Sequence, residues 1–204
     1  FKIKDMDKLI NYFLKEDYGV VRLGTFATDE VGIKNTKIID YPFLPNKSDF
    51  DEYSIINNCE FYVGSSAGIW MYPLYLKKKM LILNWYQYEL LSKLRHNRFS
   101  IVPKLYFDIK LDKYLKLDEI CKRNLDKISL NENFREKNIT LINNTSDEIL
   151  DSAIEFSQNY DSGVEDDIVK EFWSILEKYN PQYSQIINVK VCKIFLNKHK
   201  NLLF

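Results

Sequence analysis

Short apolar runs separated by amphipathic stretches divide the chain into candidate strands and candidate helices. The strand candidates are continuous apolar runs, which is typical of strands that helices cover on both faces. We expect strands over 20–23, 37–41, 60–63, 80–84 and 139–142. We expect helices over 5–16, 48–58, 68–76, 89–94, 117–122, 145–157, 164–179 and 186–203. The β-branched residues of the last range leave a strand possible there. The segment 99–117 has no clear period, so we expect it to be irregular.

The order of these elements predicts an α/β fold. We expect a Rossmann-like, mainly parallel sheet with helices on both faces, followed by C-terminal helices. Residues 1–158 are expected to form this sheet-containing domain, and residues 159–204 a helical extension that packs on it. A length of 204 residues fits one ordinary domain with such an appendage.

Composition removes several classes of function. Lys plus Arg and Asp plus Glu number 29 each, so no net charge favours nucleic acid, and we expect no nucleic-acid partner. Three scattered Cys favour a reducing compartment over a disulfide framework or a zinc site. His96 and His199 have no spaced partners, so we expect no metal site.

The apolar runs are also too short for the membrane. No window reaches the roughly 18 apolar residues of a membrane helix, so we expect no transmembrane segment. We expect a cytoplasmic protein, with peripheral attachment at the inner membrane face left open. The start at Phe1 lacks both Met and the apolar core of a signal peptide, which we interpret as a piece cut from a longer chain.

The most informative stretch is a turn of small residues between a predicted strand and a predicted helix. The turn consists of Gly64, Ser65, Ser66, Ala67 and Gly68. Small side chains let backbone N–H groups approach an anion, and a helix start adds partial positive charge. The turn matches neither a Walker loop nor the dinucleotide fingerprint. Phosphate or diphosphate binding is therefore one interpretation, and a strand-to-helix turn that simply requires small residues is the other.

Polar residues end the other predicted strands of the parallel sheet. Arg22 and Gly24 end the first, Asp40 and Tyr41 the second, and Asn84 the fourth. These strand ends are expected to converge on the edge that carries the turn. The Arg22 guanidinium suits a phosphate, but a salt bridge to Asp40 is equally open. Glu89 follows the Asn84 strand end and could reach a ligand hydroxyl.

Several of these motifs together resemble a family of bacterial glycosyltransferases. They are V-V-R-L-G from Val20, I-I-D-Y from Ile38, S-D-F-D from Ser48, C-E-F-Y-V-G-S-S-A-G from Cys59, and the strand that ends in N-W at Asn84. The turn and T-L-I-N-N-T-S-D-E-I from Thr140 are also similar, more distantly, to heptosyltransferases and other two-Rossmann (GT-B) enzymes. Ser65-Ser66-Ala67 departs from the family, whose members often have Thr/Asn-Ser/Asp-Ser.

The resemblance implies the C-terminal half of a GT-B glycosyltransferase, which binds the diphosphate of a nucleotide sugar. Arg22 and the turn would contact the diphosphate, and a second group would contact the nucleotide or the sugar. This second group consists of Gly24, Asp40, Tyr41, Asn84 and Glu89. It further implies no cofactor and no metal, a glycan or other acceptor, and an N-terminal Rossmann-like domain that is missing from this chain. The catalytic residue, the donor and the acceptor stay unidentified.

Two other functions fit a related fold. One is a non-hydrolysing sugar-nucleotide 2-epimerase, whose phosphate turn is similar, although no matching set of carboxylates and histidine can be placed in this sequence. The other is a non-catalytic, Rossmann-like interaction domain. We carry the glycosyltransferase as the main hypothesis.

Overall fold

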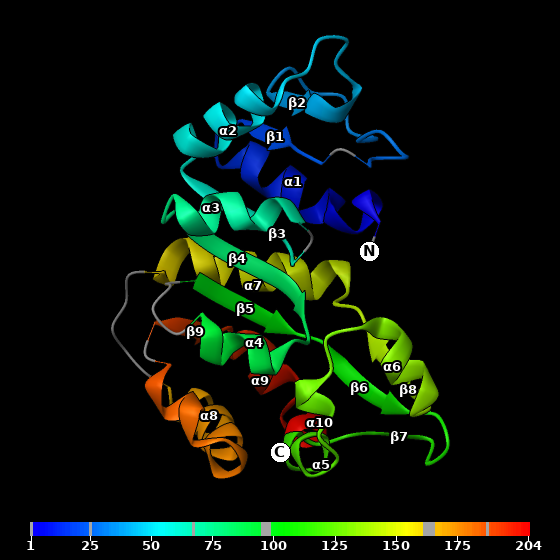
Figure 1. The fold of residues 1–204 in the computed structure, drawn as a ribbon. Coiled ribbons are helices and arrows are strands. Elements are labelled where there is room, and N and C mark those ends of the chain that lie inside the picture. Colours follow the sequence, from blue (N-terminus) through cyan, green and yellow to red (C-terminus); the bar gives the residue numbers. More distant parts are fainter. Residues whose placement is uncertain (1, 25, 67, 95–98, 161–165, 187) are drawn as a thin grey trace.

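The protein has a mixed α/β fold built around a parallel sheet that helices flank (Figure 1). The computed structural model describes residues 2–24, 26–66, 68–94, 99–160, 166–186 and 188–204. Its strands are β1 (Val20–Arg22), β2 (Ile38–Asp40), β3 (Phe61–Ser65), β4 (Lys79–Trp85), β5 (Phe99–Pro103), β6 (Leu105–Asp108), β7 (Lys113–Tyr114), β8 (Ile139–Ile142) and β9 (Val189–Val191).

Its helices lie between these strands and at both ends of the chain. The α-helices are α1 (Asp7–Lys15), α2 (Asp49–Asn58), α3 (Met71–Tyr75), α4 (Tyr88–Lys93), α5 (Leu117–Lys122), α6 (Asn131–Glu136), α7 (Ser146–Asn159), α8 (Asp167–Tyr179), α9 (Lys193–Lys198) and α10 (Lys200–Leu203). Short 3₁₀ turns are η1 (Ile3–Met6), η2 (Tyr41–Phe43), η3 (Gly68–Trp70), η4 (Leu125–Lys127) and η5 (Pro181–Gln185).

The central sheet has the order β3-β4-β5-β9, and all its pairs are parallel. Strand β4 is the hydrophobic centre of the molecule, because every residue from Met80 to Trp85 is buried. Helix α7 packs on β4 and β5 and also contacts α1 and α9. Figure 1 shows α7 crossing behind β4 and β5. The continuous apolar run in the sequence is explained by this coverage.

Two smaller sheets complete the fold. Strands β1 and β2 form a parallel pair of their own, and β6 pairs antiparallel with both β7 and β8. The expectation that the strands over 20–23, 37–41 and 139–142 share one parallel sheet with 60–63 and 80–84 is therefore wrong. The segment 99–117 is not irregular either, because it contains β5, β6 and β7. These strands are short and carry Ser, Pro and Asp among apolar residues, so no period is visible in the sequence.

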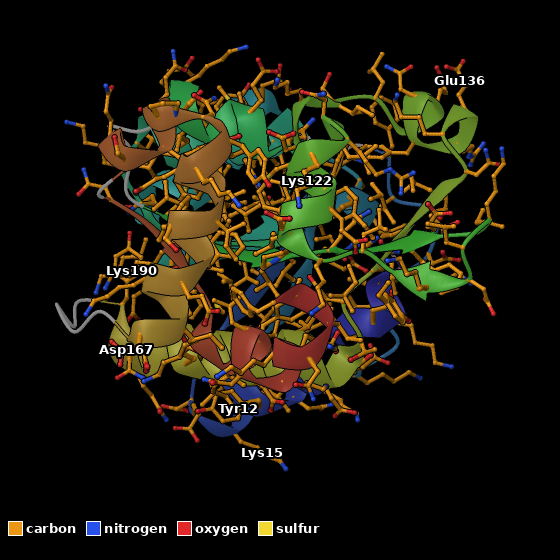
Figure 2. All side chains as sticks on the ribbon, turned by 90° about the horizontal axis from the view of Figure 1, so that it is seen from below. Tyr12, Lys15, Lys122, Glu136, Asp167 and Lys190 are labelled. Atoms are coloured by element: carbon orange, nitrogen blue, oxygen red, sulfur yellow. The ribbon has the colours of Figure 1, made fainter. Side chains whose placement is uncertain are left out.

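The C-terminal segment differs from the single helix expected over 186–203. Its Val-Lys-Val run forms β9, the edge strand of the central sheet, and α9 and α10 follow. Parallel pairing with β5 outweighs helix propensity at these β-branched residues. Residues 159–204 thus contribute a strand as well as helices, and the domain boundary after residue 158 stays a prediction. Figure 2 shows α5, with Lys122, beside α8, which begins at Asp167.

Candidate functional site

The small-residue turn and Asn84 lie at neighbouring ends of two parallel strands. Strand β3 continues through Gly64 to Ser65, and Ser65 is the register partner of Leu83 on β4. Ser66 and Asn84 therefore follow directly after paired residues. Ala67 lies outside the described residues, so its predicted role has no structural account. The structure brings the expected turn and the expected strand end to one edge of the sheet.

The helix after the turn is shorter than the sequence predicts. The range 68–76 begins with the 3₁₀ turn η3, and α3 has only five residues. Helical peptide dipoles need a row of aligned units to build up charge at the N-terminus. A helix of little more than one turn therefore favours an anion less than the longer helix expected over 68–76 would.

Gly64 is tightly packed against a side chain of its own strand. Residues 62 and 64 lie on the same face of β3, and the Tyr62 ring covers the Gly64 Cα. A Cβ at Gly64 would come within 2.6 Å of Tyr62 Cζ, closer than real Cβ atoms approach other atoms. Gly68, in contrast, has no neighbour within 4 Å of such a Cβ. Burial raises the pKa of the Tyr62 phenol, which sequence reasoning had not singled out.

Asn84 is held by a residue that lies far away in the sequence. Its backbone N–H donates to Asn144 Oδ1, and the Asn144 backbone N–H donates to Asn84 Oδ1, both at 2.7 Å. The Asn144 amide also donates to the Pro103 carbonyl at 2.8 Å. Asn84 has a φ of 57°, in the left-handed region that Asn tolerates better than most residues. This arrangement, the Asn84–Asn144 clasp, fixes the carboxyl ends of β4 and β5 to the start of α7.

Arg22 is engaged in the salt bridge that the sequence left open. Its Nη1 lies 3.2 Å and 3.3 Å from the two Asp40 carboxylate oxygens and also donates to the Asp29 carbonyl. The guanidinium lies 5.7 Å from the centre of the Phe43 ring. The Asp40 carboxylate accepts a further bond from the Val31 N–H at 2.7 Å. Arg22 and Asp40 thus anchor the loop that precedes β2.

The expected convergence of the first two strand ends on the edge that carries the turn is not seen, because β1 and β2 form a separate sheet. The Tyr41 hydroxyl is 2.8 Å from the Ser48 N–H and helps to fix the start of α2. Gly24 has a φ of 130°, which L side chains rarely adopt, so a glycine is needed after β1. Glu89 is exposed in the first turn of α4.

A carboxylate–imidazole pair beside the clasp was not expected. Glu148 Oε1 lies 2.6 Å from His199 Nε2 and 3.3 Å from Lys198 Nζ. Glu148 Oε2 accepts from the Thr145 N–H at 2.8 Å, which confirms the capping box seen in the sequence. The capping signal identified Glu148, but nothing in the sequence indicated that His199 lies next to it.

Two hollows open on the surface, and the residues of the turn line neither of them. One, of about 120 Å³, lies at the amino ends of β3 and β4 and is lined by Glu60, Phe61 and Lys79. The other, of about 300 Å³, lies beside β2 and includes Asp40 and Phe43. The first is on the edge opposite to the turn. The second places one predicted residue, Asp40, in an open groove.

Within the described ranges, no helix is long and apolar enough to cross a membrane. The same ranges contain no group of three or more His, Cys, Asp or Glu side chains that could hold a metal ion. Comparisons of this chain with protein-family models, with curated proteins and with solved structures give no match.

Proposed function

We propose that this chain binds a nucleotide diphosphate sugar as the donor domain of a GT-B glycosyltransferase. The observation that supports the proposal most directly is the pairing of Ser65 with Leu83. It sets the Ser66 turn beside Asn84 at the carboxyl ends of two parallel strands. Open α/β sheets commonly bind their ligands outside such strand ends. The motifs shared with bacterial glycosyltransferases support the choice of ligand.

The proposed chemistry uses hydrogen-bond donors in place of a metal. The Ser65 and Ser66 hydroxyls and the N–H groups after Gly64 would donate to the diphosphate oxygens and stabilise the charge that develops on the leaving group. Arg22 enters the proposal with a reduced role, because the Asp40 carboxylate already balances its charge. Arg22 would then act mainly by holding the loop over 28–31 in place.

Transfer also requires an acceptor and a base, which we assign to a second, N-terminal Rossmann-like domain. In this proposal the enzyme works in the cytoplasm of a bacterium, in polysaccharide biosynthesis, and the sugar moves to a glycan or another acceptor. Nucleoside diphosphate leaves as the second product. The donor base, the sugar and the stereochemistry are left to experiment.

Isothermal titration with UDP, GDP, ADP and CMP tests the proposal. We expect one of them to bind, and Ser66→Asp to abolish that binding, because a carboxylate would face the diphosphate. The matched control is Ser129→Asp, an equal charge change at an exposed residue before α6. Absence of binding to all four ligands in the folded protein would refute the proposal. Equal affinity of Ser66→Asp and the control would show that the turn is only structural.

NMR analysis of the products then separates transfer from epimerisation. A glycosyltransferase consumes the donor only when an acceptor is present and releases nucleoside diphosphate. A 2-epimerase converts the nucleotide sugar into its epimer without any acceptor, and that product would replace our assignment.

A further inference from the structure

Three buried oxygen atoms gather between α4, η4 and η5, away from the proposed donor site. They are the Tyr88 hydroxyl, Asp126 Oδ1 and the Tyr183 hydroxyl, and none has a hydrogen-bond partner among the described residues. Their residues are 0%, 1% and 1% exposed. Helix α4 contacts both η4 and η5. Buried polar groups in folded proteins are nearly always bonded, so three such atoms together need an explanation.

The three groups are close enough to influence one another's ionisation. The charge of Asp126 raises the pKa of both tyrosines, to which burial contributes most. Each of the three is also almost inaccessible to bulk solvent. Hydrogen bonds among the three groups themselves would satisfy all of them, because each can act as a donor or an acceptor when the carboxyl is protonated.

The surroundings of Asp126 disfavour its ionised form. On η4 itself, Lys127 is the neighbouring cation, and its Nζ donates to Asn124 Oδ1 at 2.6 Å. From the elements packed around it, Asp126 is faced by groups that are neutral or negative. These are Tyr88 and Glu89 of α4, Tyr106 of β6, Cys121 of α5 and Tyr183 of η5. Burial, which is the largest cause, and the Glu89 charge raise the Asp126 pKa, while Lys127 and backbone N–H groups oppose the shift.

We propose that the Tyr88 hydroxyl, the Asp126 carboxyl and the Tyr183 hydroxyl form a hydrogen-bonded Tyr88–Asp126–Tyr183 lock, which is closed when the carboxyl carries a proton. A protonated carboxyl is both a donor and an acceptor, as a tyrosine hydroxyl is. One tyrosine accepts the carboxyl proton, and the other donates to the remaining carboxyl oxygen. The lock joins α4, η4 and η5 by side-chain hydrogen bonds. Ionisation removes the donated proton and places an uncompensated charge in the core.

The lock braces the segment that leaves the end of β4. Tyr86 and Gln87, just before α4, donate to the Ser129 carbonyl at 3.2 Å and 3.4 Å. Tyr106 stacks on Tyr88 at a centroid distance of 6.2 Å and donates to the Tyr86 carbonyl at 2.8 Å. Raising the pH therefore loosens α4 and the connection between β4 and α4. This inference does not depend on the proposed donor site.

An NMR titration with ¹³C-carboxyl-labelled aspartate tests the lock. We expect the midpoint of one carboxyl to lie above those of the exposed aspartates, because burial raises the pKa of Asp126. Asp126→Asn should remove that resonance, whereas Asp112→Asn, at an exposed residue, should leave it in place. A midpoint for Asp126 at or below that of exposed aspartates would refute the proposal.

Tyrosine variants provide a second test, the change in melting temperature. A lock predicts a decrease, whereas unbonded hydroxyls predict no change or an increase. If the lock forms, Tyr88→Phe and Tyr183→Phe each move the Asp126 midpoint and lower the melting temperature at acidic pH. If the hydroxyls are unbonded, removing them stabilises the protein or leaves it unchanged, and that result would refute the lock. Tyr114→Phe, at an exposed tyrosine, is the control. These variants decide the question even where Asp126→Asn does not fold.

Discussion

Asn84 and Asn144 exchange two hydrogen bonds of 2.7 Å between residues that are 60 positions apart. Each side chain accepts from the other residue's backbone N–H, and both residues are 4% exposed. The pair thereby connects the end of the central sheet to the start of α7.

Asn144→Ala should lower the free energy of unfolding by about 2–4 kcal/mol. The change leaves the Asn84 N–H and the Pro103 carbonyl buried without partners, and each lost partner costs about 1–3 kcal/mol. Urea denaturation measures the loss. Asn57→Ala, at an exposed position on α2, should be neutral or slightly stabilising because Ala favours helix. Equal stability of the two variants would mean that the clasp does not form.

Gly64→Ala should be destabilised by about 1–3 kcal/mol, because its Cβ would overlap the Tyr62 ring. Gly68→Ala is the matched control, since open space surrounds its Cβ, and we expect its stability to be nearly unchanged. Replacing Tyr62 by Leu in the Gly64→Ala background should recover part of the loss. If the effects of Gly64→Ala and Tyr62→Leu on the free energy of unfolding simply add, the proposed overlap between the two residues is wrong.

Arg22→Ala should cost about 1–3 kcal/mol and loosen the loop over 28–31. The Arg22 and Asp40 side chains are only 15% and 18% exposed, so Asp40 would lose its partner in a partly desolvated place. The Val31 N–H donates a hydrogen bond to the Asp40 carboxylate, so its hydrogen-exchange rate reports on the order of the loop. Lys8→Ala breaks an exposed ion pair with Asp147 and should have no measurable effect. Unchanged exchange in Arg22→Ala would show that Arg22 does not anchor the loop.

Glu148→Gln should destabilise the protein at neutral pH by about 1–3 kcal/mol. Burial alone would raise the Glu148 pKa, but the Thr145 N–H, His199 and Lys198 outweigh it and hold the pKa below its usual value. Because the folded-state pKa is lowered, this stabilisation is present above the ordinary value of 4.5 and disappears as the pH falls through the folded value. The difference between wild type and variant should therefore shrink in acid.

Denaturation curves at several pH values measure this difference. Glu136→Gln, at an exposed glutamate at the end of α6 (Figure 2), is the control and should be close to wild type at every pH. If the loss of unfolding free energy in Glu148→Gln stays constant down to acidic pH, the charge of Glu148 does not contribute to stability.

The sequence by itself determined the local elements and the order in which they follow one another. Apolar runs predicted β1 to β4, and the Thr145–Glu148 capping box predicted the start of α7, because these signals depend on residues a few positions apart. They are local, so one chain suffices to detect them. The mixed α/β class and the parallel pairing of β3 with β4 followed from that order.

Only the tertiary structure decided which elements pair and which polar groups meet. The Val-Lys-Val run forms β9 because it pairs with the free edge of β5. Strand β8 lies outside the central sheet and pairs antiparallel with β6. Asn84 meets Asn144, and Glu148 meets His199, across large separations in sequence. Such contacts depend on how complete elements pack against each other, and a pattern that repeats every two to four residues carries no information about them.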